Sequence, residues 1–261
     1  ITPKNYKVNT TKIGFDISAL LEIDNTSNKM EVMIPDFRIE PILIGGDRPD
    51  NLSVKTKITP NHPDEPKRKD GYWNAYIVKK RKSTMIQLDI NIKSQEGLLK
   101  TEGIESIWIN ISWINYGPFG RIERLDGFAI PLNQPKFLEE REINSQTKRV
   151  IPIKTHILST IDDPYEVLKR YTQNIIRAND IITIGETPLA IMQGRYVSPL
   201  SIKVSLLSRL LCPAFHPTSS LATACGLQTL INIVGPSRVL FSFVLGGLAK
   251  TVGIKGLFYR L

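Results

Sequence analysis

The sequence predicts an α+β protein in which an N-terminal antiparallel β-sandwich is followed by an α/β domain. Over residues 12–132, apolar side chains alternate with polar ones in short runs, a period that places one face of a strand on a core. After residue 150, helix start signals stand between short apolar segments. A polar, mixed-charge tract separates the two patterns. We therefore assign the sandwich to residues 1–136, a linker to 137–149 and the α/β domain to 150–261.

Strands are expected wherever Ile, Val and aromatic residues recur at alternate positions. The clearest runs are 13–23, 54–58, 72–78, 85–92 and 107–113. Gly, Pro, Asn and Asp mark turns between them, at residues 24–26, 45–47, 59–61, 70–71, 117–118 and 126–127. Because no helical segment interrupts the series, seven or eight strands should pair as an antiparallel sandwich.

One basic cluster lies inside the predicted sandwich. Residues 67–69 and 79–82 are all Lys or Arg, with Tyr72, Trp73 and Tyr76 close by in sequence. Basic residues among aromatic ones suit nucleic acid, but a charged run at the end of a hairpin is more often a solvated turn that protects an edge strand. We favour the turn, and nucleic acid is not the partner we expect.

The second domain opens with a predicted short strand at 150–156. A helix follows from Pro164, because Asp163 is a good N-cap, proline suits the first helical position and Glu166 suits the helix dipole. The wholly apolar run 181–184 is interpreted as a buried strand. A second helix is expected after Thr187 as its cap, ending at Gly194.

The C-terminal part is the most apolar. Residues 221–234 predict a buried helix capped by Ser219 or Ser220. Residues 239–249 are interpreted as a buried strand leading into a helix, with a membrane-facing or partner-facing apolar surface as the alternative. That run is shorter than the ~20 residues that cross a bilayer. We expect a cytoplasmic protein, or one peripheral to a membrane on its cytoplasmic side.

Charge is distributed unevenly along the chain. Residues 141–261 contain 14 Lys or Arg against 6 Asp or Glu, and no acidic residue occurs after Glu186. A divalent metal needs oxygen ligands, and two cysteines with three histidines do not form a metal-binding pattern. We therefore expect no metal site here and an anionic partner instead. The alternative is that neutralising acidic residues lie outside this sequence.

Two places in the basic domain present backbone amides and polar side chains to an anion. At Gly185 a strand should run into a helix N-terminus, where free N–H groups bind phosphate. Glu186 beside it is either a general base or a residue that favours the helix dipole. Around His216, hydroxyl groups of Ser219 and Ser220 together with the imidazole suit a phosphate, although simple helix capping explains the same residues.

The runs 153–156, 162–164 and above all 180–195 (DIITIGETPLAIMQGR) resemble the N-terminal part of the coenzyme F420-0:γ-glutamyl ligase family. Residues 216–226 and the β-rich region before them resemble a cyanobacterial, ligase-like branch. The resemblance implies an enzyme that joins glutamate to the lactyl phosphate side chain of a deazaflavin, using GTP and Mg²⁺ or Mn²⁺. It places Glu186, Gly194 and Arg195 beside the substrate or nucleotide. The family's acidic metal-binding segment and Arg-Gly-rich core have no counterpart here.

The predicted function is therefore that of a ligase-like protein that binds a phosphorylated small molecule or nucleotide, with glutamyl amide formation as a further step. The predicted ligand-binding residues are Gly185, Glu186, Gln193, Gly194, Arg195, His216, Ser219 and Ser220; no catalytic residue is assigned. GTP and Mg²⁺ or Mn²⁺ would be cofactors only if the ligase reaction is retained. The alternative is a non-catalytic scaffold or assembly protein, peripheral to a membrane or bound to a protein through the sandwich or the apolar C-terminal region.

Overall fold

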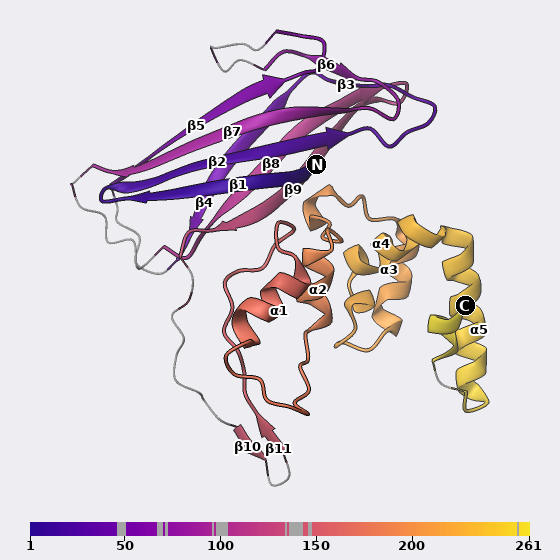
Figure 1. The fold of residues 1–261 in the computed structure, drawn as a ribbon. Helices are drawn as coiled ribbons and strands as arrows, with labels where there is room; N and C mark the ends of the chain where they lie inside the picture. Colours follow the sequence, from indigo (N-terminus) through magenta and orange to yellow (C-terminus); the bar gives the residue numbers. More distant parts are fainter. Residues whose placement is uncertain are drawn as a thin grey trace. The chain divides into compact units, whose positions relative to one another are not determined.

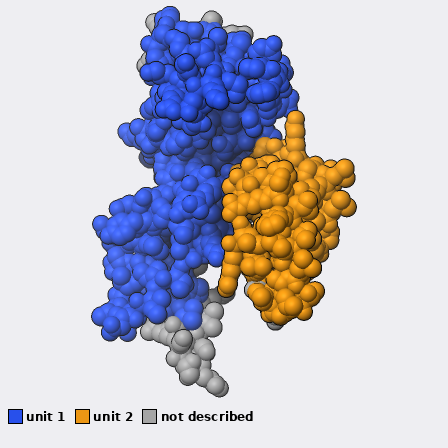
Figure 2. All heavy atoms as spheres, turned by 90° about the vertical axis from the view of Figure 1, so that its right-hand side faces the viewer, with its two compact units in different colours: residues 1–196 blue, residues 197–261 orange. Residues whose placement is uncertain are grey.

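The chain folds as two compact units, Ile1–Tyr196 and Val197–Leu261 (Figures 1 and 2). This computed structural model describes residues 1–45, 51–66, 70, 73–95, 97, 104–133, 135, 143–145, 148–254 and 256–261. Most of the predicted linker 137–149 lies outside these residues, so the domain boundary placed there stays a prediction. Residues 150–196 belong to the first unit together with the strands.

Two antiparallel sheets form the first part of unit 1, as predicted (Figure 1). The four-stranded sheet has the order β1 (Thr2–Thr11), β2 (Gly14–Asp24), β7 (Ser83–Ser94) and β5 (Leu52–Asn61). In the five-stranded sheet, β8 (Ser106–Gly117) pairs with β9 (Gly120–Pro131) and also with β4 (Phe37–Ile44) and β3 (Val32–Ile34). Strand β6 (Tyr76–Val78) pairs with β3.

The sandwich core comes from the alternation seen in the sequence. Along β2, every second side chain from Phe15 to Ile23 is buried, and the residues between are partly exposed. Strands β7 and β8 repeat this pattern. Burial of Ile and Leu side chains contributes on the order of 2 kcal/mol each. The apolar side chains with at most 2% exposure in these three strands are Phe15, Ile17, Ala19, Leu21, Ile86, Leu88, Ile90, Ile92, Ile107, Ile109 and Ile111.

All five predicted strand runs contain a strand, and two predicted turns are wrong. Residues 59–61 end β5, where they pair with Gln87, Ile86 and Met85 of β7. Residues 126–127 lie within β9 and pair with β8. The exposed turn expected at 79–82 is confirmed between β6 and β7. Residues 67–69, 71–72 and 46–47, which carry the rest of the basic cluster and parts of two turns, lie outside the described residues.

Strands β1, β4 and β9 have no clear period in the sequence. Strand β1 lies at the edge of its sheet and is mostly exposed, so polar residues are tolerated on both of its faces. Strand β4 contains Pro41, which removes a hydrogen-bond donor and suits an edge strand. Strand β9 begins with charged residues and becomes buried on both faces at Gly127–Ile130. A two-residue period cannot appear where neither face, or both faces, are buried.

Helices rather than strands follow the sandwich. The helix α1 (Pro164–Thr172) is confirmed with its predicted cap, since Asp163 accepts hydrogen bonds from the backbone of Tyr165 and Glu166. The strands predicted at 150–156 and 181–184 are wrong: apart from the end of β11 (Lys148–Val150), which pairs with β10 (Ile143–Ser145), these residues are irregular, and Ile181 is 88% exposed. The helix α2 (Glu186–Met192) is capped by Gly185, not Thr187.

Unit 2 consists of helices and short 3₁₀ turns. Its elements are η2 (Pro199–Ser201), α3 (Leu206–Leu211), η3 (Cys212–Ala214), η4 (Ser220–Ala222), α4 (Ala224–Val234), α5 (Pro236–Thr251) and η5 (Leu257–Arg260). Leu227, Ile231 and Val239 form its small core. The strand expected at 239–249 is wrong, because these residues belong to α5. The predicted α/β domain is thus a helical region, and the whole chain remains α+β.

Gly235 separates α4 from α5 with a φ of 91°, and Pro236 starts α5. In unit 2, serine and threonine cap two of the helical elements: Ser219 accepts from Leu221 N at η4, and Thr223 accepts from Gly226 N at α4. No single helix among the described residues has the length and apolar character to span a bilayer. Helices α4 and α5 have the necessary length and apolar character only when taken together, and the pair is bent by 114°.

Candidate functional site

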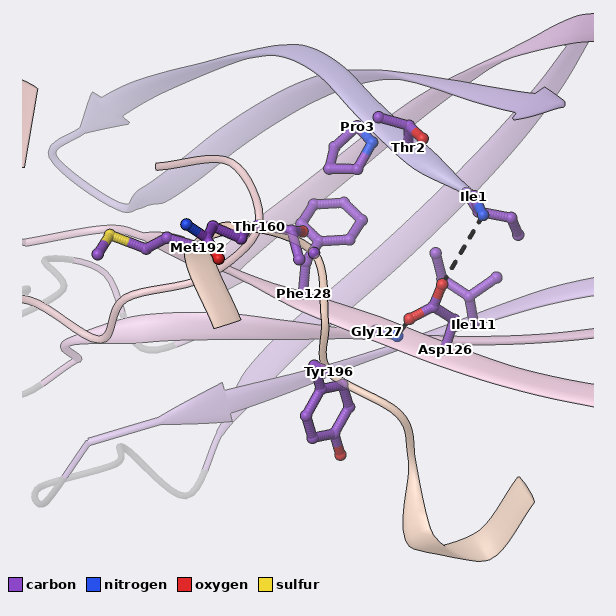
Figure 3. A pocket seen from close by; sticks show the side chains of 12 residues that line it. Ile1, Thr2, Pro3, Ile111, Asp126, Gly127, Phe128, Thr160, Met192 and Tyr196 are labelled. Atoms are coloured by element: carbon purple, nitrogen blue, oxygen red, sulfur yellow. Dashed lines mark hydrogen bonds and ion pairs between the residues drawn. The ribbon is translucent and has the colours of Figure 1, made fainter. Parts of the chain in front are cut away.

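A cavity of about 370 Å³ lies in unit 1, where the sandwich meets the segment that carries α1 and α2 (Figure 3). Its walls are partly apolar and partly polar. They are formed by Ile1, Thr2, Pro3, Ile111, Asp126, Gly127, Phe128, Thr160, Met192, Gln193, Gly194 and Tyr196. A smaller cavity of about 280 Å³ shares Pro3 and Thr160 with it. Pockets of a few hundred cubic ångströms suit small ligands.

Asp126 supplies the carboxylate of this cavity. It pairs with Ile111 across the β8–β9 ladder, and directly paired residues project from the same face of a sheet. Because Ile111 belongs to the sandwich core, Asp126 lies on the core side of β9. Burial is the main influence on the Asp126 carboxyl and raises its pKa, against a hydrogen bond from Gly127 N to Asp126 Oδ1 of 2.8 Å. Asp126 Oδ2 lies 3.8 Å from the Ile1 nitrogen (Figure 3).

The opposite face of β9 is covered by aromatic rings. A Cβ atom on Gly127 would lie 2.4 Å from Cζ2 of Trp108 and 2.9 Å from the carbonyl oxygen of Ile109, so only glycine fits. The Trp108 ring contacts Tyr196 edge to face, with ring centroids 6.1 Å apart. Residue 127 therefore lets the indole approach the backbone, and the indole in turn holds Tyr196 at the cavity.

The C-terminal end of α2 forms another part of the wall. Gly194 has a φ of 70°, a conformation that ends helices and favours glycine. Its N–H donates to Ile191 O at 2.9 Å, and Arg195 N donates to Ala190 O at 2.9 Å. These bonds fix the turn in which Gln193 and Gly194 line the cavity. The side chain of Arg195, between two lining residues, is exposed.

A buried hydrogen-bond network positions the loop that contains Thr160. The His156 ring bonds the Tyr171 hydroxyl through Nδ1 at 2.6 Å and Asp162 Oδ1 through Nε2 at 2.9 Å. Asp162 Oδ2 accepts from Ser159 N at 2.8 Å. The Ser159 hydroxyl donates to the Ala129 carbonyl of β9 at 2.7 Å. Because Ala129 belongs to β9 and follows the cavity residue Phe128, this last bond attaches the loop to β9 beside the cavity.

The structure distributes the eight predicted ligand-binding residues over three places. Gln193 and Gly194 line the cavity, with Arg195 adjacent in the chain. Gly185 and Glu186 are exposed at the opposite end of α2. His216, Ser219 and Ser220 belong to unit 2. Their ligand binding stays a prediction in all three places.

The polar groups around His216 bond to each other. His216 Nδ1 is 2.8 Å from the Thr218 hydroxyl oxygen, and the Ser219 hydroxyl accepts from Leu221 N at 3.3 Å. Ser220 contributes its backbone carbonyl to Thr223. Ser219 caps only the short turn η4. The helix predicted at 221–234 starts at Ala224 and is capped by Thr223, so the caps predicted for it are wrong.

Asp126, Thr160 and Tyr196 are cavity residues that were not identified from the sequence. Asp126 was assigned to a turn because Asp-Gly is a common turn pair. The only local signal for a strand is that a run of apolar residues, 128–132, follows immediately. Nothing in the sequence around Thr160 or Tyr196 indicates that each lies beside β9.

Three acidic residues of the α1–α2 segment are already engaged in other contacts. Asp162 uses both oxygens within the buried network, Asp163 caps α1, and Asp180 accepts from Arg177 N at 2.8 Å. Across the described ranges, no three His, Cys, Asp or Glu side chains are grouped as metal ligands would be. We therefore derive no catalytic step through Mg²⁺ or Mn²⁺ in this chain.

One family model matches the chain over residues 1–134, and its description is F420-0:gamma-glutamyl ligase, N-terminal Ig-like domain. This range covers the sandwich, including Asp126 and Phe128 of the cavity. A comparison with curated proteins and one with solved structures gave no match.

Proposed function

This chain belongs to the family of the N-terminal Ig-like domain of F420-0:gamma-glutamyl ligase, and from that premise we propose that it binds a phosphorylated small molecule at the cavity of unit 1. The observation that carries the proposal is the meeting of Gln193 and Gly194 with Asp126 around one cavity of about 370 Å³. Gln193 and Gly194, directly after α2, come from the run that resembles the ligases, and Asp126 comes from the Ig-like domain.

The cavity divides the ligand into two parts. Phe128, Met192 and Ile111 give apolar contact, while Asp126 accepts hydrogen bonds from hydroxyl or amino groups. A phosphate would be repelled by the carboxylate, so it lies outside the cavity, at the exposed guanidinium of Arg195. Arginine binds phosphate through paired N–H donors. The ligand is thus a phosphate ester whose uncharged, hydroxyl-bearing portion enters the cavity.

The proposal covers binding and not amide-bond formation. Among the described residues, Asp162 is engaged in the buried network and Asp163 in capping α1, so neither is free to carry a metal-bound nucleotide. A non-catalytic ligand-binding role is consistent with these contacts. Addition of F420-0, glutamate, GTP and Mn²⁺ should therefore produce no glutamyl adduct of F420-0, which mass spectrometry of the reaction mixture checks.

Isothermal titration with F420-0, GTP and ATP, each with and without Mn²⁺, tests the binding proposal. We expect F420-0 to bind without metal. Asp126→Asn should weaken binding by about tenfold to a hundredfold, because a hydrogen bond to a charged group is worth roughly 1.5–3 kcal/mol. Arg195→Gln should weaken it by a similar factor through loss of the phosphate contact.

Glu186→Gln is the matched control, because Glu186 is exposed at the far end of α2. Its affinity should stay within about twofold of the parent chain, since no contact with ligand is lost. Absence of heat with all three compounds would refute the proposal. If the Asp126 and Arg195 variants bind F420-0 as tightly as the parent chain does, the binding site lies outside this cavity.

A further inference from the structure

Helix α5 of unit 2 has its large and small side chains on unexpected faces. The face that packs inward combines Val239, which is 2% exposed, with small residues: Ser242 and Ala249 are 4% and 8% exposed, and a Cβ on Gly246 would lie 3.0 Å from Cβ of Phe258. A helix of a water-soluble domain normally buries its large apolar residues and exposes polar ones. Here the outward face carries the large apolar side chains.

The outward side chains form a continuous stripe. Leu240, Phe241, Val244 and Leu248 are 46%, 61%, 51% and 61% exposed. Their spacing of one, three and four residues places them on one side of an α-helix. Val252, just past the helix end, is 76% exposed. Single exposed apolar residues need no explanation, whereas a stripe along the helix marks a surface that another apolar phase covers.

Helix α3 repeats the arrangement independently. Ser208 is fully buried, while Leu206 and Leu210, four positions apart on one side, are 76% and 74% exposed. The Ser208 hydroxyl donates to Ser205 O at 2.9 Å, so its burial leaves no polar atom without a partner. Two helices of this unit therefore bury a serine and expose leucine side chains, while Leu207 and Leu211 of α3 pack on the core.

The charge of unit 2 indicates which kind of partner covers the exposed apolar side chains. Residues 197–261 contain six Lys or Arg and no Asp or Glu. Lys203, Arg209, Arg238, Lys250 and Arg260 are all exposed in the structure. Two copies pressed together through these faces would oppose like charges, which disfavours association. Anionic lipid headgroups over acyl chains complement both properties, since each Lys or Arg near such a surface contributes favourably.

We propose that unit 2 docks on the surface of an anionic lipid bilayer, with the α5 stripe and the α3 leucines in the headgroup–acyl boundary and the Lys and Arg side chains on the headgroups. The proposal concerns a different surface from the ligand cavity and does not rest on it. Docking of this kind leaves α5 lying in the interface. It requires no helix that spans the membrane.

Co-sedimentation of the full chain with vesicles tests the proposal. Vesicles of phosphatidylcholine with about one third phosphatidylglycerol should bind the protein, and vesicles of phosphatidylcholine alone should bind at least about tenfold less. Raising NaCl from about 0.05 M to about 0.5 M should release most of the bound protein, because salt screens surface charge. The double variant Phe241→Ser, Leu248→Ser should lower partitioning at least about tenfold through loss of buried apolar area.

The matched control removes two apolar side chains that are exposed on the sandwich. Phe119 and Ile77 are 78% and 49% exposed, and the double variant Phe119→Ser, Ile77→Ser should bind vesicles like the parent chain. A second variant, Arg209→Glu with Lys250→Glu, should lose binding while its circular dichroism stays unchanged. Binding unaffected by both unit 2 variants would overturn the proposal. A parent chain that does not bind the anionic vesicles would also overturn it, as when Phe241 and Leu248 instead mediate a dimer or contact an acidic protein.

Discussion

At the scale of single residues, Gly127 is a position where the sandwich has no room for a side chain. Trp108 occupies the space that a side chain would need. Gly127→Ala should lower the free energy of unfolding by roughly 2–3 kcal/mol, because overpacking against an indole and a backbone carbonyl forces both to shift. Gly117→Ala, whose Cβ would come no closer than 3.9 Å to Glu31 O, is the control and should stay within about 0.5 kcal/mol. Urea denaturation of both variants checks this prediction; equal stabilities would contradict the packing of Trp108.

Asp126 should stabilise ligand binding at the expense of folding. Since burial raises its pKa, the carboxyl is best accommodated when protonated. The contribution of Asp126 to the free energy of unfolding is therefore fully present below the ordinary pKa of an aspartate. It is lost as the pH rises through the raised pKa of the folded state. Asp126→Asn, which keeps an acceptor for Gly127 N, should therefore raise the melting temperature at pH 7 while it weakens binding. A lower melting temperature at pH 7 would argue against a buried carboxylate.

His62 should make the sandwich sensitive to mild acid. Its ring stacks on Tyr76 with centroids 3.8 Å apart, Nδ1 is 2.7 Å from the Thr84 hydroxyl oxygen, and burial lowers its pKa. The unfolded chain then binds the proton first, so stability falls as pH drops below about 6.5, by up to about 1.4 kcal/mol per pH unit. His62→Phe should flatten the dependence, and the exposed His216→Gln should not. Melting temperatures measured between about pH 7.5 and 5 test this prediction. The same pH dependence in the parent chain and both variants would contradict a role for His62.

At the scale of elements, α1 is held to the loop around His156 by polar groups as well as apolar ones. Tyr171 closes the small cluster with Val167 and Met192, and its hydroxyl also accepts from His156 N at 3.2 Å. Removing this hydroxyl leaves a buried N–H and a ring nitrogen without a partner. An unsatisfied buried group costs roughly 1–3 kcal/mol.

Tyr171→Phe should therefore destabilise unit 1 by roughly 1–3 kcal/mol and speed hydrogen exchange at Ser159 and Asp162. Tyr165→Phe is the control on the same helix, because Tyr165 is 69% exposed, and it should change stability by less than about 0.5 kcal/mol. Exchange rates that do not differ between the variants would mean that the network does not hold the loop.

Sequence patterns predicted those elements that have one buried face or a strong cap. The alternation in β2, β7 and β8 and the Asp163-Pro164 start of α1 are of this kind. A short continuous apolar run carries no period, so residues 181–184 and 239–249 were assigned to strands. In the structure the first is irregular and the second is helical, since Gly235 and Pro236 start a helix there. Outward-facing leucines also violate the rule on which such assignments depend.

At the scale of the whole molecule, the two units divide the chemistry of the chain. Unit 1 brings together an Ig-like sandwich and the α1–α2 segment around a cavity with one carboxylate. Unit 2 has no acidic residue and exposes both leucine and lysine. The charge asymmetry was readable from composition. The cavity was not, because it needs Asp126 and Gln193 to meet across 67 positions of sequence.

Chemical-shift mapping of backbone amides in the 261-residue chain, titrated with F420-0, tests the central claim most directly. We predict that the largest shifts fall on Gly127, Gln193, Gly194 and Tyr196, and that Asp126→Asn suppresses them at the same ligand concentration. Shifts confined to residues 216–220 or to Gly185 and Glu186, or no shifts at saturating ligand, would contradict the assignment of the cavity as the binding site.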